Sequence, residues 1–279
     1  MKIFEKGEYT GERALYATRD AEIRSCRFFD GESPLKESES LVIKDSVFEW
    51  KYPLWYCRNV KVENGRLTES ARSGIWYTEN IEMKNTRIDA PKTFRRSSGI
   101  RLDGCDMENA LESLWYCRDI VLKNAHVVGD YLGLSSENVY VENLRLDGNY
   151  FLDGAKNVVV KNSYLNSKDS FWNCENVEVY DSVIIGEYIG WNTKNIKFVN
   201  CKIESNQGFC YMENLTLENC VLENTDLAFE FSSVNATVNS KIDSVKNVKS
   251  GKISAFEIGE IIMDEKFIDP SKTEITVKK

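Results

Sequence analysis

The sequence predicts an all-β protein, a single-stranded parallel β-helix (solenoid) with a repeat near 19 residues. Three observations lead to this prediction. Short lines of alternating apolar and polar residues recur along the chain, an Asn or Asp opens most of these lines, and the spacing between the opening residues is constant over a long stretch. The strict spacing of 19 residues starts at Asp119 and continues at Asn138, Asn157, Asn176, Asn195 and Asn214. A constant period of this size is typical of a repeat protein.

Each repeat is predicted to contain three short inward-facing segments. With the opening Asn or Asp as position zero, positions +1 and +3 are apolar and +2 and +4 are mostly polar, the pattern of a half-buried strand. Position +5 is nearly always Asn or Asp, which tolerate the left-handed backbone of a sharp corner. Position +8 is apolar again, and position −5 contains no polar residue, so we assign it to the interior. We therefore expect a triangular solenoid whose coils pair as parallel strands.

The repeat continues through nearly the whole chain, so we expect one domain over residues 1–279. About twelve coils are predicted between residues 20 and 240. Because a coil can bury its apolar face only against its neighbours, the ends need caps. Residues 1–19 are expected to form the N-terminal cap, and residues 241–279 the C-terminal cap and tail.

Three stretches of the sequence are distinctive: LWYCRNVKVENGRL at 54–67, FWNCENVEVYDSVI at 171–184 and DSVKNVKSGKISAFEIGEIIMDE at 243–265. They resemble an uncharacterised bacterial family, a domain of unknown function grouped with the pectin-lyase-like right-handed parallel β-helices. The resemblance extends over essentially the whole chain. It implies the fold and its right-handed winding, and it provides no catalytic residues.

Composition and charge exclude several partners. The chain has 36 basic and 44 acidic residues and a net charge of −8, so we predict no nucleic-acid partner, which would require a basic patch. No stretch approaches the roughly 18 apolar residues of a membrane span, and the first residues do not resemble a secretory signal. We therefore predict no membrane partner and a cytoplasmic location. The eight cysteines form no CxxC pair, so we expect buried, reduced thiols, no metal and no cofactor.

Positions −4 and −3 are unusually aromatic, and five of the six tryptophans stand at −4. The predicted ligand-binding residues at these positions are Trp55, Tyr56, Trp76, Tyr77, Arg95, Arg96, Trp115, Tyr116, Asp153, Trp172, Trp191 and Tyr211. Because position −4 also holds charged residues, we place it on the outside, where aromatic rings suit the flat faces of a sugar chain. Simple strand alternation predicts the opposite, with −4 on the same side as the small residues at −2 and the tryptophans in the core.

Catalytic residues are harder to assign. Arg95 is a candidate base of the pectate-lyase type, and Asp153 is the acidic residue at position −4. At one coil per ~4.8 Å the two would lie about 14 Å apart, too far to act on one bond. Lys168 and Asp169 form a second polar cluster. The single histidine, His126, is expected to be an ordinary surface imidazole.

Three functions remain open, and the sequence does not decide whether the protein is an enzyme. The first is binding of an oligo- or polysaccharide, with or without modification, along the aromatic positions. The second is a polysaccharide lyase or hydrolase centred on Arg95 or Asp153. The third is a non-enzymatic structural solenoid that associates with itself into a homo-oligomer.

Overall fold

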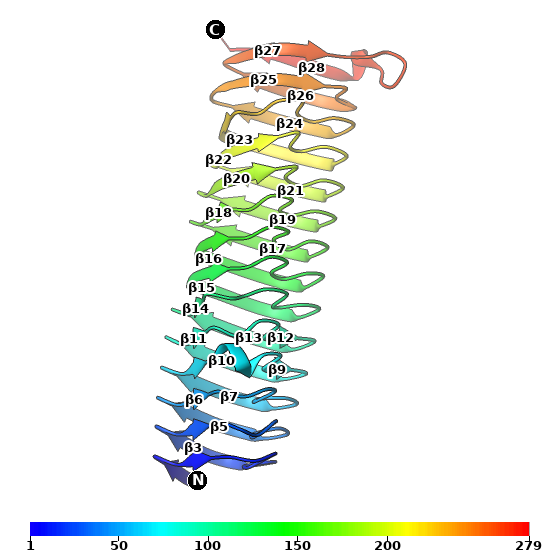
Figure 1. Ribbon diagram of the computed structural model, residues 1–279. Coiled ribbons are helices and arrows are strands. Elements are labelled where there is room, and N and C mark those ends of the chain that lie inside the picture. The colour runs from blue at the N-terminus through cyan, green and yellow to red at the C-terminus, as the bar shows by residue number, and fades with distance from the viewer. Residues whose placement is uncertain (279) are drawn as a thin grey trace. The chain divides into compact units, whose positions relative to one another are not determined.

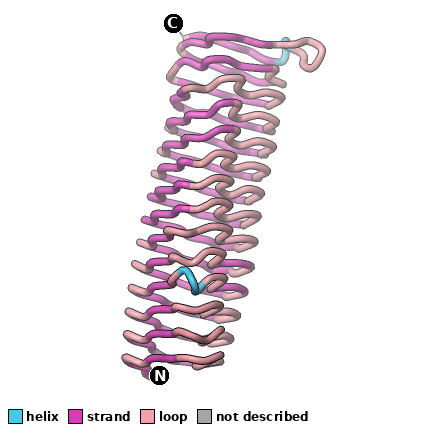
Figure 2. Tube along the Cα trace, viewed as in Figure 1, coloured by secondary structure: helices cyan, strands magenta, loops and turns pink. Residues whose placement is uncertain are grey.

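The computed structural model describes residues 1–278, which fall into two compact units, unit 1 from Met1 to Tyr140 and unit 2 from Val141 onward. In each unit the chain winds in successive coils of short strands joined by loops (Figure 1, Figure 2). Helix in this described part is limited to two 3-10 segments, η1 (Glu69–Ala71) and η2 (Pro270–Lys272). None of the helices described has the length and apolar character required to cross a membrane.

Most coils of unit 1 contain a long strand and a short strand. The long strands are β1 (Lys2–Glu5), β3 (Arg19–Arg24), β5 (Glu39–Lys44), β7 (Arg58–Glu63), β10 (Glu79–Lys84), β13 (Ser98–Asp103) and β15 (Arg118–Val128). The short strands are β2 (Glu8–Tyr9), β4 (Arg27–Phe28), β6 (Val47–Phe48), β8 (Arg66–Leu67), β11 (Arg87–Ile88) and β14 (Asp106–Met107). The third segment of the coil is a strand at β9 (Ile75–Trp76) and β12 (Phe94–Arg95). Equivalent residues of successive coils pair in parallel, for example Ile23 with Ile43 and Ile43 with Val62.

Unit 2 repeats this arrangement, after a strand that crosses the boundary in the chain, β16 (Glu137–Asp147). Its long strands are β17 (Lys156–Lys161), β19 (Glu175–Tyr180), β21 (Lys194–Val199), β23 (Glu213–Glu223), β24 (Ser233–Val238), β26 (Ser250–Ala255) and β28 (Thr273–Val277). Its short strands are β18 (Tyr164–Asn166), β20 (Val183–Glu187) and β22 (Lys202–Asn206). Near the C-terminus β25 (Lys241–Lys246) pairs in parallel with β27 (Glu257–Ile262) as a separate sheet.

The predicted all-β parallel β-helix is confirmed, but the predicted number of coils is too low. The described residues contain fifteen long strands rather than about twelve. Strand β1 pairs with β3, with Lys2 opposite Ala21, so the segment predicted as the N-terminal cap forms a regular coil. At the other end β26 pairs with both β24 and β28, which extends the coils beyond residue 240. The sequence pattern missed these coils because their exposed ends replace apolar residues with polar ones.

The core of each unit is built from stacked columns of equivalent side chains. In unit 1 the rings of Phe28 and Phe48 stack with centroids 4.9 Å apart. In unit 2 Phe198 packs edge-on against Phe171 and Phe209, at 6.2 and 5.8 Å. All eight cysteines are buried free thiols, as predicted.

The Asn residues that open the repeats are held in the left-handed backbone region. In unit 2, φ is 59° at Asn176 and 54° at Asn195. The Asn176 amide nitrogen donates a hydrogen bond to the Asn157 side-chain oxygen at 3.1 Å, and Asn195 donates to Asn176 at 3.0 Å. The repeated Asn therefore serves both the turn of the backbone and a ladder of side-chain hydrogen bonds between coils.

We expect Asn176→Ala to lower the free energy of unfolding by about 1 to 2 kcal/mol, because it removes two ladder hydrogen bonds and forces a Cβ-bearing residue without a compensating side chain into the left-handed region. Asn176→Gly loses the same hydrogen bonds but adopts positive φ without strain, so it should be the less destabilised variant. Urea denaturation of both variants measures the difference. If both variants lost the same free energy of unfolding, the positive φ at Asn176 would make no contribution to the difference in stability.

Candidate functional site

The backbone conformation at position −3 decides which way the aromatic side chains face. Tyr56 has a φ of 56°, in the left-handed region, so strand alternation is interrupted at this residue. In its coil Leu54 and Cys57 are fully buried, whereas Trp55 is half-buried and Tyr56 is exposed. Two successive side chains thus face outward between two that face inward. The prediction that strand alternation puts the tryptophans in the core is therefore wrong.

The tryptophans of unit 1 lie in a stacked column rather than projecting into solvent. The Trp55 and Trp76 rings are parallel, with centroids 5.2 Å apart. The Arg95 guanidinium lies between Trp76 and Trp115, 4.7 Å from each ring centroid. The indole N–H of Trp76 donates to the Lys92 carbonyl at 2.8 Å, and the N–H of Trp115 donates to the Tyr131 carbonyl at 2.7 Å. Ring faces and N–H groups are thus used within the protein, which gives this column a structural role.

Arg95, the candidate base, is part of this column. One guanidinium nitrogen lies 3.5 Å from the Glu112 carboxylate, and its buried Nε has no hydrogen-bond partner among the described residues. Both guanidinium faces are covered by indole rings. The group therefore fits a cation–π contact inside the column better than proton transfer to a bound substrate.

The exposed aromatic column of unit 1 is the one at position −3. The Tyr56 and Tyr77 rings stack in parallel with centroids 4.8 Å apart, and the Arg96 guanidinium lies 5.9 Å from the Tyr116 ring centroid. The tyrosines are 36 to 50% exposed. These four side chains line a groove of about 630 Å³, which we call the tyrosine groove.

The other side of the tyrosine groove is formed by residues at position −1. They are Arg58, Glu79, Ser98, Arg118 and Glu137. The structure thus brings together Tyr56, Tyr77, Arg96 and Tyr116 from the predicted ligand-binding residues and adds Arg58 and Arg118. The sequence analysis missed these two arginines because they alternate with other residues and form no repeated pattern.

In unit 2 the same positions are less aromatic and more fully hydrogen-bonded. Trp172 and Trp191 stack in parallel at 5.6 Å, and their N–H groups donate to the carbonyls of Tyr188 and Gln207. Asp153, the acidic candidate, accepts a hydrogen bond from the Asn173 amide at 2.8 Å. Tyr211 stands at position −3 of this unit and is 43% exposed. The indole N–H groups of Trp172 and Trp191 and the carboxylate of Asp153 thus already have hydrogen-bond partners within the protein.

The second polar cluster of unit 2 is also engaged within the protein. The Lys168 ammonium lies 3.0 Å from the Glu187 carboxylate. Asp169 is buried, and this burial raises the pKa of its carboxyl group. A separate hollow of about 480 Å³ in unit 2 is lined by the Asn ladder and by side chains at position +2. It contains none of the predicted site residues.

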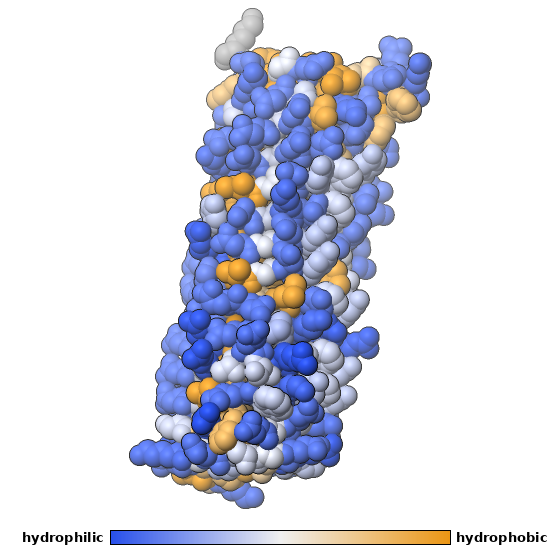
Figure 3. Space-filling view, viewed as in Figure 1, coloured by the Kyte–Doolittle hydropathy of each residue, from blue (hydrophilic) through white to orange (hydrophobic). Residues whose placement is uncertain are grey.

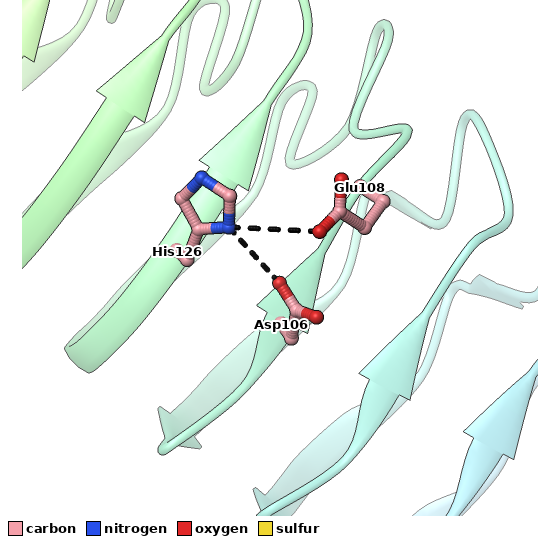
Figure 4. Close-up of side chains that lie close together, drawn as sticks. All are labelled: Asp106, Glu108 and His126. Atoms are coloured by element: carbon pink, nitrogen blue, oxygen red, sulfur yellow. Dashed lines mark hydrogen bonds and ion pairs between the residues drawn. The ribbon is translucent and has the colours of Figure 1, made fainter.

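His126 lies beside two carboxylates, an arrangement that the sequence analysis did not anticipate. Its Nδ1 is 3.1 Å from an Asp106 oxygen and 3.7 Å from a Glu108 oxygen, and both carboxylates are directed toward it (Figure 4). Asp106 and His126 are register partners on β14 and β15, so comparing equivalent positions of successive coils would have found this pair. The ligand atoms lie within 4.8 Å of one another, close enough to hold a metal ion. A surface imidazole hydrogen-bonded to Asp106 accounts equally well for the arrangement.

The surface visible in Figure 3 is mostly hydrophilic, with apolar residues in small separate patches. An extended apolar stripe does not appear on this face.

Comparisons with known proteins identify a family and a fold. A family model described as a protein of unknown function, DUF3737, matches residues 2–276. No curated protein matches the sequence. Among solved structures, the alginate lyase AlyF-OU02 is similar with a TM-score of 0.53 and 9% identity, covering 100% of this chain and 82% of that chain.

Two further structures show weaker similarity. A mutant tailspike protein of E. coli bacteriophage HK620 in complex with a pentasaccharide has a TM-score of 0.36 and 10% identity, over 87% of this chain and 60% of that chain. The mannuronan C-5 epimerase A-module of Azotobacter vinelandii has a TM-score of 0.32 and 11% identity, over 99% and 88%. Likeness at such low identity concerns the fold alone.

Proposed function

We propose that this chain, which belongs to the DUF3737 family of proteins of unknown function, binds an oligo- or polysaccharide in the tyrosine groove of unit 1. The observation that carries the proposal is the choice of residues at position −3. Most coils have positive φ at this position. Unit 2 places Gly154, Asn173 and Asn192 there in three successive coils, where they adopt it at little cost, and the next coil has Tyr211 with a φ of 59°. Unit 1 places bulky residues in the same conformation, with φ of 57° at Tyr77 and 54° at Tyr116.

A bulky residue in the left-handed region costs of order 1 to 3 kcal/mol, and such strain tends to cluster at ligand sites. The Tyr56 and Tyr77 rings stack on each other, but the tyrosines stay 36 to 50% exposed, so packing within the protein leaves part of their surface unused. Their cost is explained if the exposed part of these rings is needed for a ligand. Flat, rigid phenol rings suit the apolar faces of sugars, since they bury area at low cost in side-chain entropy.

The polar residues of the groove complete the chemistry that a sugar requires. Arginine side chains donate hydrogen bonds, Glu79 and Glu137 accept them, and the Ser98 hydroxyl does both. The similarity in fold to an alginate lyase supports a sugar polymer as a ligand that this architecture can accommodate. We propose binding rather than bond cleavage, because Arg95 is enclosed between two indole rings and Asp153 lies in unit 2, outside the groove.

The Tyr77→Ala variant should bind oligosaccharides more weakly by about 1 to 2 kcal/mol, which is roughly 5- to 30-fold in Kd, because a ring at the middle of the platform is lost. Isothermal titration calorimetry with a panel of oligosaccharides measures this change. Tyr211→Ala is the matched control, since Tyr211 is an exposed tyrosine at the same position in unit 2. Its Kd should equal that of the wild type. The proposal fails if no oligosaccharide binds, or if Tyr77→Ala binds as tightly as the wild type.

A further inference from the structure

We infer that the tyrosine groove selects an acidic sugar chain, and that Arg96 and Arg118 bind its carboxylate groups. This inference rests on the proposed function and goes beyond it by naming the chemical class of the ligand. It depends on the charge of the groove, on which of its arginines are already paired, and on the short side chain between them.

The arginines of the groove differ in whether they already have a carboxylate partner. Arg58 has a partner within the groove, since its guanidinium lies 3.7 Å from the Glu79 carboxylate. Arg96 and Arg118 take part in none of the ion pairs found among residues 1–278. Both are exposed, and both line the groove. In a chain with a net charge of −8, two adjacent arginines without a carboxylate partner are available to an anionic ligand.

Arginines elsewhere in unit 1 show what the usual arrangement is. Arg27 forms two hydrogen bonds with the Glu49 carboxylate, at 2.7 and 2.8 Å. Arg66 bonds to Asp89 at 3.0 Å. An arginine on the outside of these coils thus often finds a carboxylate in a neighbouring coil. Arg72, Arg96, Arg101 and Arg118 of unit 1 have no such ion pair among the described residues, and of these Arg96 and Arg118 line the groove with the exposed tyrosines.

A short side chain, Ser98, stands on the wall of the groove that the two arginines also line. Ser98 is the register partner of both Glu79 and Arg118, so it lies between these two long side chains on the wall of the groove. Arg96 belongs to the same coil as Ser98, with only the buried Ser97 between them. The short Ser98 side chain therefore leaves room on a wall of the groove that Arg96 and Arg118 also line, and it adds a hydroxyl donor. A carboxylate placed there would accept hydrogen bonds from all three residues.

The spacing of the coils indicates the direction in which a sugar chain would lie. Tyr77, Arg96 and Tyr116 stand at equivalent positions of three successive coils, which are spaced by about 4.8 Å. A sugar chain running along the stack of coils would place successive rings beside successive coils. Its carboxylates could then meet Arg96 and Arg118, while the ring faces contact the tyrosines. A neutral sugar chain would keep the ring contacts and ordinary hydrogen bonds and would lack the charged contacts.

The test compares three short oligomers of equal length, one of galacturonic acid, one of glucose and one of a sulfated sugar, by isothermal titration calorimetry at low salt. The wild type should bind the galacturonic acid oligomer at least about tenfold more tightly than the glucose oligomer. Arg118→Gln and Ser98→Glu should each remove most of that preference, the second because it supplies a competing carboxylate. Affinity for the glucose oligomer should fall by only about two- to fourfold in either variant, because a neutral sugar loses one hydrogen bond there and no charged contact.

Arg101→Gln is the matched control for overall charge. Arg101 is an exposed arginine on β13 of the same unit, and it does not line the groove. It should retain the full preference for the acidic oligomer. If Arg101→Gln and Arg118→Gln lose the preference for the acidic oligomer equally, the preference comes from long-range charge and the assignment of Arg118 is overturned.

Other outcomes separate this inference from the proposed function. If acidic and neutral oligomers bind equally well and Tyr77→Ala weakens both, the inference is wrong and the proposed function stands. If the sulfated oligomer binds as tightly as the carboxylated one, the groove recognises anions in general and the carboxylate assignment is overturned. If none of the oligomers binds, both the inference and the proposed function fail.

Discussion

The Trp115→Ala variant is expected to lose about 3 kcal/mol of unfolding free energy, near the lower end of the range for Trp to Ala substitutions because the indole is only partly buried. Three interactions are lost together. The ring covers one face of Arg95 at 4.7 Å, its N–H donates to the Tyr131 carbonyl at 2.7 Å, and its edge contacts the Tyr131 ring. The half-buried charge of Arg95 would then keep only Trp76 and Glu112 as close partners.

Urea denaturation followed by far-ultraviolet circular dichroism measures this loss. Trp115→Phe is the informative control, because it keeps an aromatic ring beside Arg95 and removes the N–H donor and part of the ring, at a cost of about 1 to 2 kcal/mol. Tyr77→Ala should lose less than Trp115→Ala, since the Tyr77 ring is exposed. If Trp115→Ala were as stable as the wild type, the tryptophan column would have no structural role and would become the better candidate for the ligand platform.

The second large effect is a loss of stability at alkaline pH. Burial raises the pKa of Cys57, Cys117 and Cys210 to about 12, and the pKa of Cys105 to about 11. Because the folded-state pKa lies above the unfolded one, each thiol stabilises the fold fully below pH 9 or so and loses this contribution as pH rises toward its folded pKa. Between about pH 8 and about pH 10.5 each thiol should cost about 2 kcal/mol of unfolding free energy.

Urea denaturation at the two pH values measures the change in unfolding free energy summed over all titrating groups. Cys117→Ser isolates the thiol, because Ser97 and Ser136 occupy the equivalent position in neighbouring coils and the substitution fits the column. This variant should lose about 2 kcal/mol less than the wild type over the same change in pH. An unchanged pH dependence would mean that the Cys117 thiolate forms in the folded state without penalty.

Much of the fold could be predicted from sequence because one physical requirement is repeated in every coil. Apolar residues at +1 and +3 must face inward, and Asn or Asp at the corners must adopt positive φ. Val177 and Val179 illustrate the first requirement, since both are buried on β19. Asn176 illustrates the second, with a φ of 59°. The count of coils could not be predicted as well, because the terminal coils have no neighbour on one side and so tolerate polar residues such as Lys2.

The candidate site was predictable only in part. The sequence singled out Tyr56, Tyr77, Arg96 and Tyr116, and the structure places all four along one groove. It could not separate them from the tryptophans one position earlier, since both columns are equally aromatic. Burial and hydrogen bonding distinguish the two: the Trp76 N–H is bonded to a backbone carbonyl, whereas the Tyr77 ring is exposed.

The sequence by itself determined the architecture, because the burial of apolar side chains and the Asn corners are local requirements that recur in every coil. Only the tertiary structure decided which way the aromatic side chains face, because one left-handed residue at position −3 interrupts the alternation of the strand. It also decided which polar residues lie opposite each other, as Arg118 and Ser98 do, since that depends on the register between coils. The repeat indicates which residues of successive coils are neighbours, but the hydrogen bonds and ring contacts of their side chains depend on the three-dimensional arrangement.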